Sequence, residues 1–224
     1  MIKVERKSSE KAEKAIESLR REKARSGSYN TPEVNAALRE MFHGKCYICE
    51  NKQITSYQIE HLVSHRGNAD LKYDWNNLFL ACAHCNNTKL DKYEPIIDCT
   101  KENVEALIAF RRTGYFGTDE KLLFEKLDDR IEVENTIKLL QEVYYGSTPQ
   151  KKMESTILRR MLRKELSAFK EYVREYHEAE DEEKEDLKYL LQKELRDSSP
   201  FAAFKRWLIR DNREVYAELL GYIE

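Results

Sequence analysis

The sequence predicts a mainly α-helical protein, α+β overall, that contains one small unit of a β-hairpin followed by a helix and braced by a zinc ion. Gly and Pro are scarce, at 7 and 4 of 224 residues. Charged residues make up 36% of the chain, above the roughly 25% that is usual, and both features favour long solvated helices. Residues 46–93 break the helical pattern and hold four of the five cysteines.

Two helices are expected before this unit. In residues 9–25, Ala12, Ile16 and Leu19 recur at helical spacing, and Ser26-Gly27 stops the helix. Thr31-Pro32 then opens a second helix as N-cap and first helical residue, and Gly44 ends it.

Within the unit, residues 57–62 and 78–82 are short segments rich in β-branched, aromatic and apolar residues, which predict two strands of a hairpin. The residues between them form a long loop. A structureless loop of such length is usually functional. A helix over 85–93 should follow, ending before Pro95.

Helical periodicity returns after residue 95. Thr100 and Thr118 are expected N-caps, Thr148-Pro149 opens the longest helix, and Ser199-Pro200 caps another. The acidic stretch 178–186 is interpreted as a solvated turn or helix end. The expected helices cover 101–112, 119–128, 131–145, 149–178, 187–195 and 201–209, with a last short helix opened by Asn212.

This pattern divides the chain into an N-terminal helical lead (1–45), the zinc-braced unit (46–95) and an α-helical C-terminal region (96–224) that could dock a partner. The N-terminus lacks the apolar stretch of a signal peptide, and no apolar run approaches a membrane span, so a cytoplasmic protein is expected. The net charge of −2 means that nucleic-acid affinity must come from local patches or from a partner.

Two Cys-x-x-Cys pairs predict a structural zinc site. In a reducing compartment such pairs are more often zinc ligands than disulfides. Four thiolates close a tetrahedral site and leave no position for substrate. His84, inside the second pair, could replace a thiolate, and Cys99 is left over as an ordinary buried thiol. The predicted ligands are Cys46, Cys49, Cys82 and Cys85.

A second group of residues has the chemistry of phosphodiester hydrolysis. His61 can take a proton from water near neutral pH. Glu60 and Asn86 offer a carboxylate and an amide oxygen, donors that suit Mg²⁺ or Mn²⁺. Lys89, one turn after Asn86, could contact a phosphate. A solvated surface lysine is the simpler interpretation of Lys89, and a structural histidine that of His61.

Three further residues are candidates around this group. Asn77 precedes the second strand, where its amide can bind backbone across the loop and orient His61. His65 and Arg66 follow the first strand and could contact nucleic acid, although exposed loop residues without a role are equally common.

The stretch from Cys46 to Lys89 resembles the HNH endonuclease family, which has the ββα-metal fold. The matching residues are Cys46-x-x-Cys49, Glu60-His61, Asn77-Leu78 and Cys82-x-x-Cys85-Asn86-x-x-Lys89. The resemblance implies that His61 is the general base, Asn77 the orienting residue and Asn86 the metal-side residue. The chain departs from the family at two positions, with Glu60 in place of the usual Asp and Asn86 where His is frequent.

A narrower resemblance, in layout and in the Ile59-Glu60-His61 form of the motif, is to the HNH subunit of Septu-type and retron-associated anti-phage systems. It implies an ABC/SMC-like ATPase partner. The leading hypothesis is a DNA endonuclease. An RNA nuclease and an inactive zinc-braced nucleic-acid-binding module are the alternatives, and the complete trio Glu60, His61 and Asn86 favours an enzyme over the module.

Overall fold

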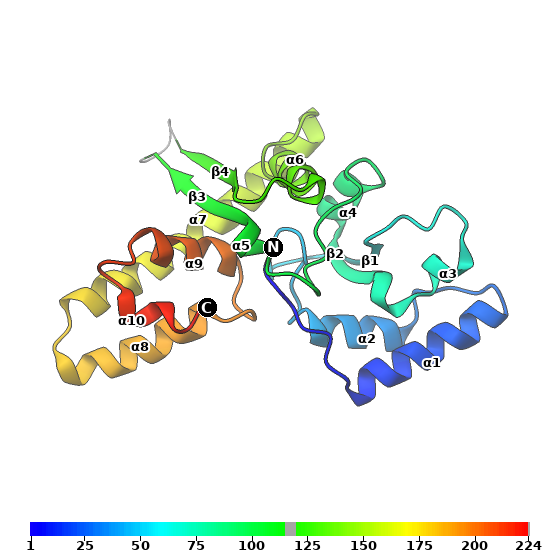
Figure 1. Cartoon of the computed structure of the whole chain (residues 1–224), viewed down its shortest axis with the longest axis horizontal. Coiled ribbons are helices and arrows are strands. Elements are labelled where there is room, and N and C mark those ends of the chain that lie inside the picture. The colour runs from blue at the N-terminus through cyan, green and yellow to red at the C-terminus, as the bar shows by residue number, and fades with distance from the viewer. Residues whose placement is uncertain (115–119, 224) are drawn as a thin grey trace.

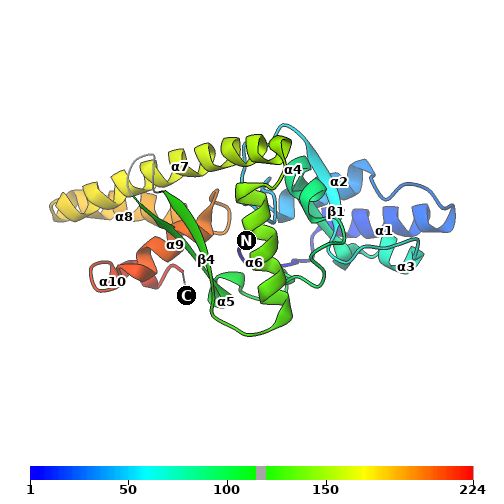
Figure 2. The same cartoon turned by 90° about the horizontal axis from the view of Figure 1, so that it is seen from above.

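The computed structural model describes residues 1–114 and 120–223. In Figure 1 the N-terminal helices lie beside a two-stranded hairpin at one end of the molecule, and the C-terminal helices form the other end. One long helix runs from the C-terminal end toward the middle of the molecule, as the view from above shows (Figure 2). The mainly helical fold with small sheets agrees with the prediction.

The N-terminal pair consists of α1 (Glu10–Ala24) and α2 (Pro32–Met41). Both begin as the sequence predicted, because the side chain of Thr31 accepts a hydrogen bond from Val34 N, and Ser9 caps α1 in the same way. The buried faces of the two helices pack against each other and against the hairpin.

The hairpin joins β1 (Tyr57–His61) to β2 (Leu78–Cys82) in an antiparallel register that places His61 opposite Leu78. The two predicted strands are therefore confirmed. The connecting loop is less irregular than expected, because it contains the short helix α3 (Ala69–Lys72) and the 3-10 turn η1 (Trp75–Asn77). The next helix, α4 (Ala83–Lys89), ends earlier than expected, since the following residue has a positive φ of 46°.

A second hairpin replaces two predicted helices. The segment expected to be helical over 101–112 forms only the short α5 (Val104–Leu107) before β3 (Ile108–Thr113). The segment expected over 119–128 is β4 (Lys121–Lys126), antiparallel to β3. The expected cap, Thr118, lies outside the described residues. The prediction was wrong because Phe110 and Phe124 find aromatic partners on α6 and α9, and such tertiary packing overrides weak helical periodicity.

The remaining helices are α6 (Ile131–Tyr145), α7 (Pro149–Glu178), α8 (Asp181–Leu195), α9 (Ala202–Asp211) and α10 (Ala217–Leu220). The bounds of α6 and α7 match the prediction. The acidic stretch proved to be mostly the first turns of α8. Ser199 does not cap α9, whose N-cap Phe201 has a left-handed backbone, and the last helix begins five residues after Asn212.

Two clusters of buried apolar residues support this arrangement. The first runs from Met1 to Phe204 and includes residues of the N-terminal pair, both hairpins, α6 and the first half of α7. The second joins the distal half of α7 to α8, α9 and α10 through residues such as Phe169, Leu191 and Leu219. The division of the chain into three domains remains a prediction.

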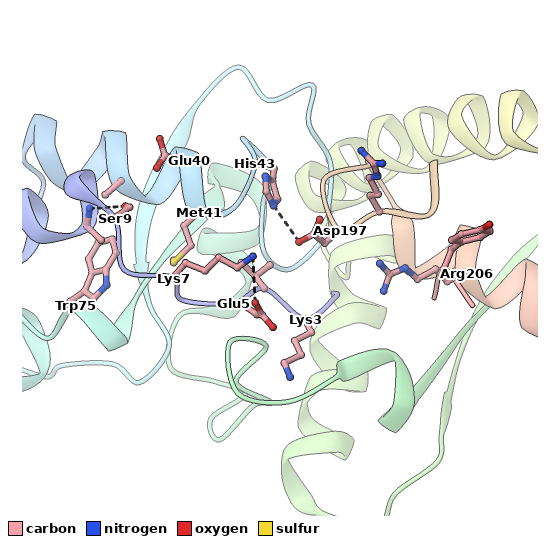
Figure 3. A pocket seen from close by; sticks show the side chains of 15 residues that line it. Lys3, Glu5, Lys7, Ser9, Glu40, Met41, His43, Trp75, Asp197 and Arg206 are labelled. Carbon is pink, nitrogen blue, oxygen red and sulfur yellow. Dashed lines mark hydrogen bonds and ion pairs between the residues drawn. The ribbon is translucent and has the colours of Figure 1, made fainter. Parts of the chain in front are cut away.

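A cavity of about 550 Å³ lies between the N-terminal segment, α2 and the turn before α9. Figure 3 shows the side chains of His43 and Asp197 next to each other in its lining, with His43 Nε2 3.3 Å from Asp197 Oδ2. Its described lining includes none of the residues predicted for catalysis. Among the helices of residues 1–114 and 120–223, none is long and apolar enough to cross a bilayer.

Candidate nuclease site

The four predicted zinc ligands come together at one end of the first hairpin. Cys46 and Cys49 lie in the turn after α2, Cys82 ends β2, and Cys85 is in the first turn of α4. All four Sγ atoms lie within 4.8 Å of one another, and those of Cys49 and Cys82 are 4.0 Å apart. A tetrahedral zinc with bonds of about 2.3 Å requires Sγ atoms about 3.8 Å apart.

The surroundings of these thiols also fit a bound cation. The cysteines are buried, and burial raises the pKa of the Cys49 and Cys85 thiols well above the ordinary value. A divalent ion would stabilise the thiolates that burial otherwise disfavours. The donor set therefore fits a structural zinc ion. Cys99 lies apart from this cluster in the core, where burial raises its pKa to about 12.

His84 links the cluster of four cysteines to the C-terminal region instead of joining it. Its Nε2 lies 2.8 Å from the carbonyl oxygen of Val143 in α6, and its Nδ1 lies 2.7 Å from Glu154 Oε2 in α7. Tyr144 also donates to the carbonyl of Cys49 at 3.1 Å. Both ring nitrogens of His84 are thus engaged, and the structure gives no support to the alternative in which His84 replaces a thiolate.

His61 is the last residue of β1, and its geometry defines which nitrogen can act as a base. Nε2 lies 3.0 Å from the carbonyl oxygen of Lys72. A carbonyl only accepts, so Nε2 carries the proton of the neutral ring and Nδ1 keeps its lone pair. Burial lowers the pKa of His61 below its usual value of 6.5, which favours the neutral ring. Two rings flank it, those of Tyr29 and His65.

Asn77 connects the two ends of the loop that follows His61. Its Oδ1 accepts from Val63 N at 2.8 Å, and its Nδ2 donates to the carbonyls of Val63 and Leu71 at 2.8 and 3.0 Å. Its own carbonyl accepts from Leu62 N at 3.0 Å. These bonds hold the chain on both sides of the segment that supplies the acceptor for His61, which is the geometry expected of an orienting residue.

Glu60 and Lys89 form a buried ion pair. Lys89 Nζ lies 2.7 Å from Glu60 Oε1, and the two side chains are 0% and 4% exposed. The ammonium also donates to the carbonyl of His61 at 2.9 Å, while Tyr47 donates to Glu60 Oε2 at 2.6 Å. Burial raises the pKa of Glu60 to about 7, although Lys89 opposes this shift. A phosphate contact by Lys89 stays a prediction, and it would require this side chain to leave its buried position.

Asn86 faces the same side of β1 as Glu60. Its Nδ2 donates to Gln58 Oε1 at 2.5 Å, and among the described residues no hydrogen bond uses its Oδ1. The free amide oxygen fits a hard divalent cation. Glu60 is the right kind of donor, but both of its oxygens are engaged. Its predicted role as a metal ligand therefore depends on Lys89 releasing the carboxylate.

The last two predicted residues lie at the edge of this site. His65 is half-buried against His61, with ring centroids 4.8 Å apart, and its Nδ1 accepts from Gly67 N. Arg66 is exposed and lies 3.3 Å from Asp91. His65 thus lies directly beside the base, and the contact of both residues with nucleic acid remains a prediction.

The sequence analysis missed several residues that contact the predicted ones, among them Gln58, Glu94 and Tyr29. Gln58 shares a strand face with Glu60, a relation that the two-residue period of a strand could have revealed. Glu94 accepts from the backbone and side chain of Ser64 and lies 3.5 Å from Lys89 Nζ. Tyr29 touches His61 from the loop between α1 and α2, and no local pattern marks it.

With this geometry established, the comparisons with known proteins define the class of the unit. Residues 46–92 match the family model described as HNH endonuclease, so this part of the chain is an HNH endonuclease domain. The chain is also similar to two curated proteins named Septu protein PtuB. That of Bacillus mycoides (strain KBAB4) is 33% identical over 84 residues, covering 31% of this chain and 28% of the relative.

The second relative, from Bacillus thuringiensis, is 32% identical over 78 residues, covering 32% of this chain and 30% of the relative. The similarity thus spans less than a third of the length of the curated relatives that it matches. No solved structure gives a significant match.

Proposed function

We propose that this chain is a divalent-metal-dependent endonuclease that hydrolyses phosphodiester bonds in DNA as the effector of an anti-phage defence complex. The observation that carries the proposal is the state of His61. Its Nε2 lies 3.0 Å from the Lys72 carbonyl oxygen, so the neutral ring carries its proton there and leaves Nδ1 as an acceptor. Burial lowers the pKa of His61, which favours this neutral form. The HNH domain match and the Septu relatives support the same reaction class.

Each residue then has a defined task. His61 Nδ1 takes a proton from the attacking water, and the resulting charge is shared with Nε2, whose bond to the Lys72 carbonyl strengthens as the ring becomes cationic. Asn77 holds the loop so that the Lys72 carbonyl stays in place beside His61. Asn86 offers its amide oxygen, and Gln58 fixes the direction of that oxygen through its bond to Nδ2.

Asn86, with Glu60 once Lys89 releases it, would hold Mg²⁺ or Mn²⁺. When bound, such an ion stabilises the negative charge that develops on the phosphate and on the leaving oxygen. The zinc cluster has a separate task. Its four cysteines come from the turn before β1, the end of β2 and the start of α4, so a zinc ion held by them would fix the helix that carries Asn86 relative to the strand that carries His61.

The test is cleavage of supercoiled plasmid and of tRNA by zinc-loaded protein in Mg²⁺ or Mn²⁺. We expect His61→Ala to lose about 10²–10⁴-fold in the rate of DNA cleavage, the range typical of a general base. The matched control is His177→Ala, which changes an exposed histidine on α7. Preferential cleavage of tRNA would favour the RNA nuclease. Nucleic-acid binding without cleavage, for wild type and variant alike, would favour the inactive module.

We further propose that an ABC/SMC-like ATPase subunit controls the nuclease, on the basis of the resemblance to Septu-type HNH subunits. The net charge of −2 supports a partner, because a chain without a broad excess of cations gains little affinity from phosphate contacts alone. The first half of α7, where Met153 and Ile157 are exposed, is the proposed docking surface. Co-expression with an adjacently encoded ATPase tests this proposal. Separate elution of the two proteins, with full activity of the free chain at physiological salt, would contradict it.

A further inference from the structure

The loop between α1 and α2, residues 25–31, forms one wall of the site although it lies outside the HNH domain at 46–92. Tyr29 in this loop is half-buried, and its ring stands edge-on to the ring of His61, with centroids 4.7 Å apart and planes at 78°. Edge-to-face pairs of this kind are favourable and prefer one relative orientation of the rings. The contact therefore restricts how far the imidazole can rotate.

The same loop also contacts the residues that position the hydrogen-bond acceptor of His61, the carbonyl oxygen of Lys72. Tyr73 OH donates to the carbonyl of Gly27 at 2.6 Å, and Lys72 Nζ lies 3.4 Å from the same oxygen. Lys72 in turn supplies the carbonyl that binds His61 Nε2 at 3.0 Å. The backbone of Gly27 is thus connected to the base through a single residue, while Tyr29 touches the base directly.

The loop itself is held firmly enough to act as a support. Gly27 N donates to the carbonyl of Glu22 at 2.8 Å, and the Glu22 carboxylate pairs with Arg25 and accepts from Ser28 N. A Cβ added at Gly27 would lie 1.9 Å from Glu22 Oε2, so a larger residue would displace this carboxylate from its partners. Across the loop, Lys23 pairs with Asp70 of α3 at 2.6 Å.

From these contacts we infer that Tyr29 is a positioning residue for His61, and that the N-terminal helical lead is part of the nuclease site. The inference rests on the proposed function of His61 as the base. Tyr29 keeps the imidazole turned so that Nε2 meets the Lys72 carbonyl and Nδ1 faces the water to be activated. The ring provides this constraint, so phenylalanine should serve and an aliphatic side chain of similar size should not.

The experiment compares Tyr29→Leu and Tyr29→Phe with the wild type in zinc-loaded protein. Because a displacement of about 1 Å can cost on the order of 100-fold in rate, we expect Tyr29→Leu to lower kcat by about 10–100-fold. KM should stay within about twofold, since the interaction acts on the base and not on substrate binding. Tyr29→Phe should retain the wild-type kcat within the same margin. The control Tyr189→Leu changes an exposed tyrosine on α8 and should leave kcat unchanged.

A second readout does not depend on cleavage. The ¹⁵N chemical shifts of the His61 ring nitrogens, measured without Mg²⁺, report which nitrogen carries the proton. Wild type and Tyr29→Phe should show the proton on Nε2, and Tyr29→Leu should show a mixture of the two tautomers. Urea unfolding should show that the folded state of Tyr29→Leu remains populated under these conditions.

Three results would overturn the inference. They are a wild-type kcat and tautomer in Tyr29→Leu, equal losses in the Leu and Phe variants, and a loss confined to KM, which would make Tyr29 a substrate contact. If the wild type itself cleaves nothing, the proposed function fails, and the ring ¹⁵N shifts still decide whether Tyr29 positions His61.

Discussion

Removal of the Lys89 ammonium tests the structure most directly, because this side chain is fully buried where the sequence suggested a surface phosphate contact. Lys89→Met keeps much of the volume and removes the charge. At the observed 2.7 Å, the attraction between Lys89 and Glu60 is about 6 kcal/mol for an effective dielectric constant of about 20. Desolvation of both ions offsets part of this. Breaking a buried pair by removing one partner lowers the free energy of unfolding by about 3–5 kcal/mol.

The loss of stability in Lys89→Met should also depend on pH, whereas a loss caused by poorer packing alone would not. Burial places the pKa of Glu60 at about 7 even with Lys89 present. At pH 8 the variant must either bury an unpaired carboxylate or take up a proton, so we expect the full loss. At pH 5 the carboxyl is protonated in both proteins, and the loss should fall to about the 1–3 kcal/mol expected for hydrogen bonds left unmade.

The assay is urea unfolding of zinc-loaded protein at pH 5 and pH 8. Adding Glu60→Gln to Lys89→Met should recover more than half of the loss at pH 8, because the unpaired charge is then absent. Lys92→Met, which changes an exposed lysine nearby, should cost less than about 0.5 kcal/mol. A loss below about 1 kcal/mol for Lys89→Met at pH 8, or an equal loss at both pH values, would refute a buried Glu60–Lys89 pair.

Three further predictions follow from the site. Elemental analysis should find one zinc ion per chain, and Cys82→Ser should give metal-poor, aggregating protein, whereas Cys99→Ser should keep the zinc because Cys99 lies outside the cluster. Asn86→Ala should raise the Mg²⁺ concentration needed for cleavage by about tenfold, and EDTA should abolish cleavage before zinc is lost. The raised pKa of Glu60 means that the Mg²⁺-free folded state binds more protons than the unfolded chain between pH 4.5 and about 7. Stability should fall by about 3 kcal/mol as pH rises through this window, and Glu60→Gln should remove this slope.

For each of these three predictions, one result would contradict the role proposed for the residue. Full zinc content in Cys82→Ser would exclude the four-thiolate site. An unchanged metal requirement in Asn86→Ala would exclude its amide as a ligand. A slope that persists in Glu60→Gln would mean that another buried group takes up the proton.

Much of the site was predictable because its signals are local. The spacing of Cys46, Cys49, Cys82 and Cys85 indicated one cluster before any fold was known, and the four Sγ atoms do lie together. The period of two in the strands and the caps of the helices depend on neighbouring residues, so the first hairpin, α1, α2, α6 and α7 were predicted correctly.

Local patterns in the chain were therefore enough to predict the chemical groups of the HNH domain and both strands of its hairpin. Tertiary structure decided the rest, because burial and pairing depend on residues far apart in the chain. Lys89 has the appearance of a surface lysine until Glu60, 29 positions earlier, meets it in the core. The segments that contain Phe110 and Phe124 form strands because distant helices provide aromatic partners for these two side chains. Tyr29 acquires a place beside His61 only when the loop after α1 folds back onto the first hairpin.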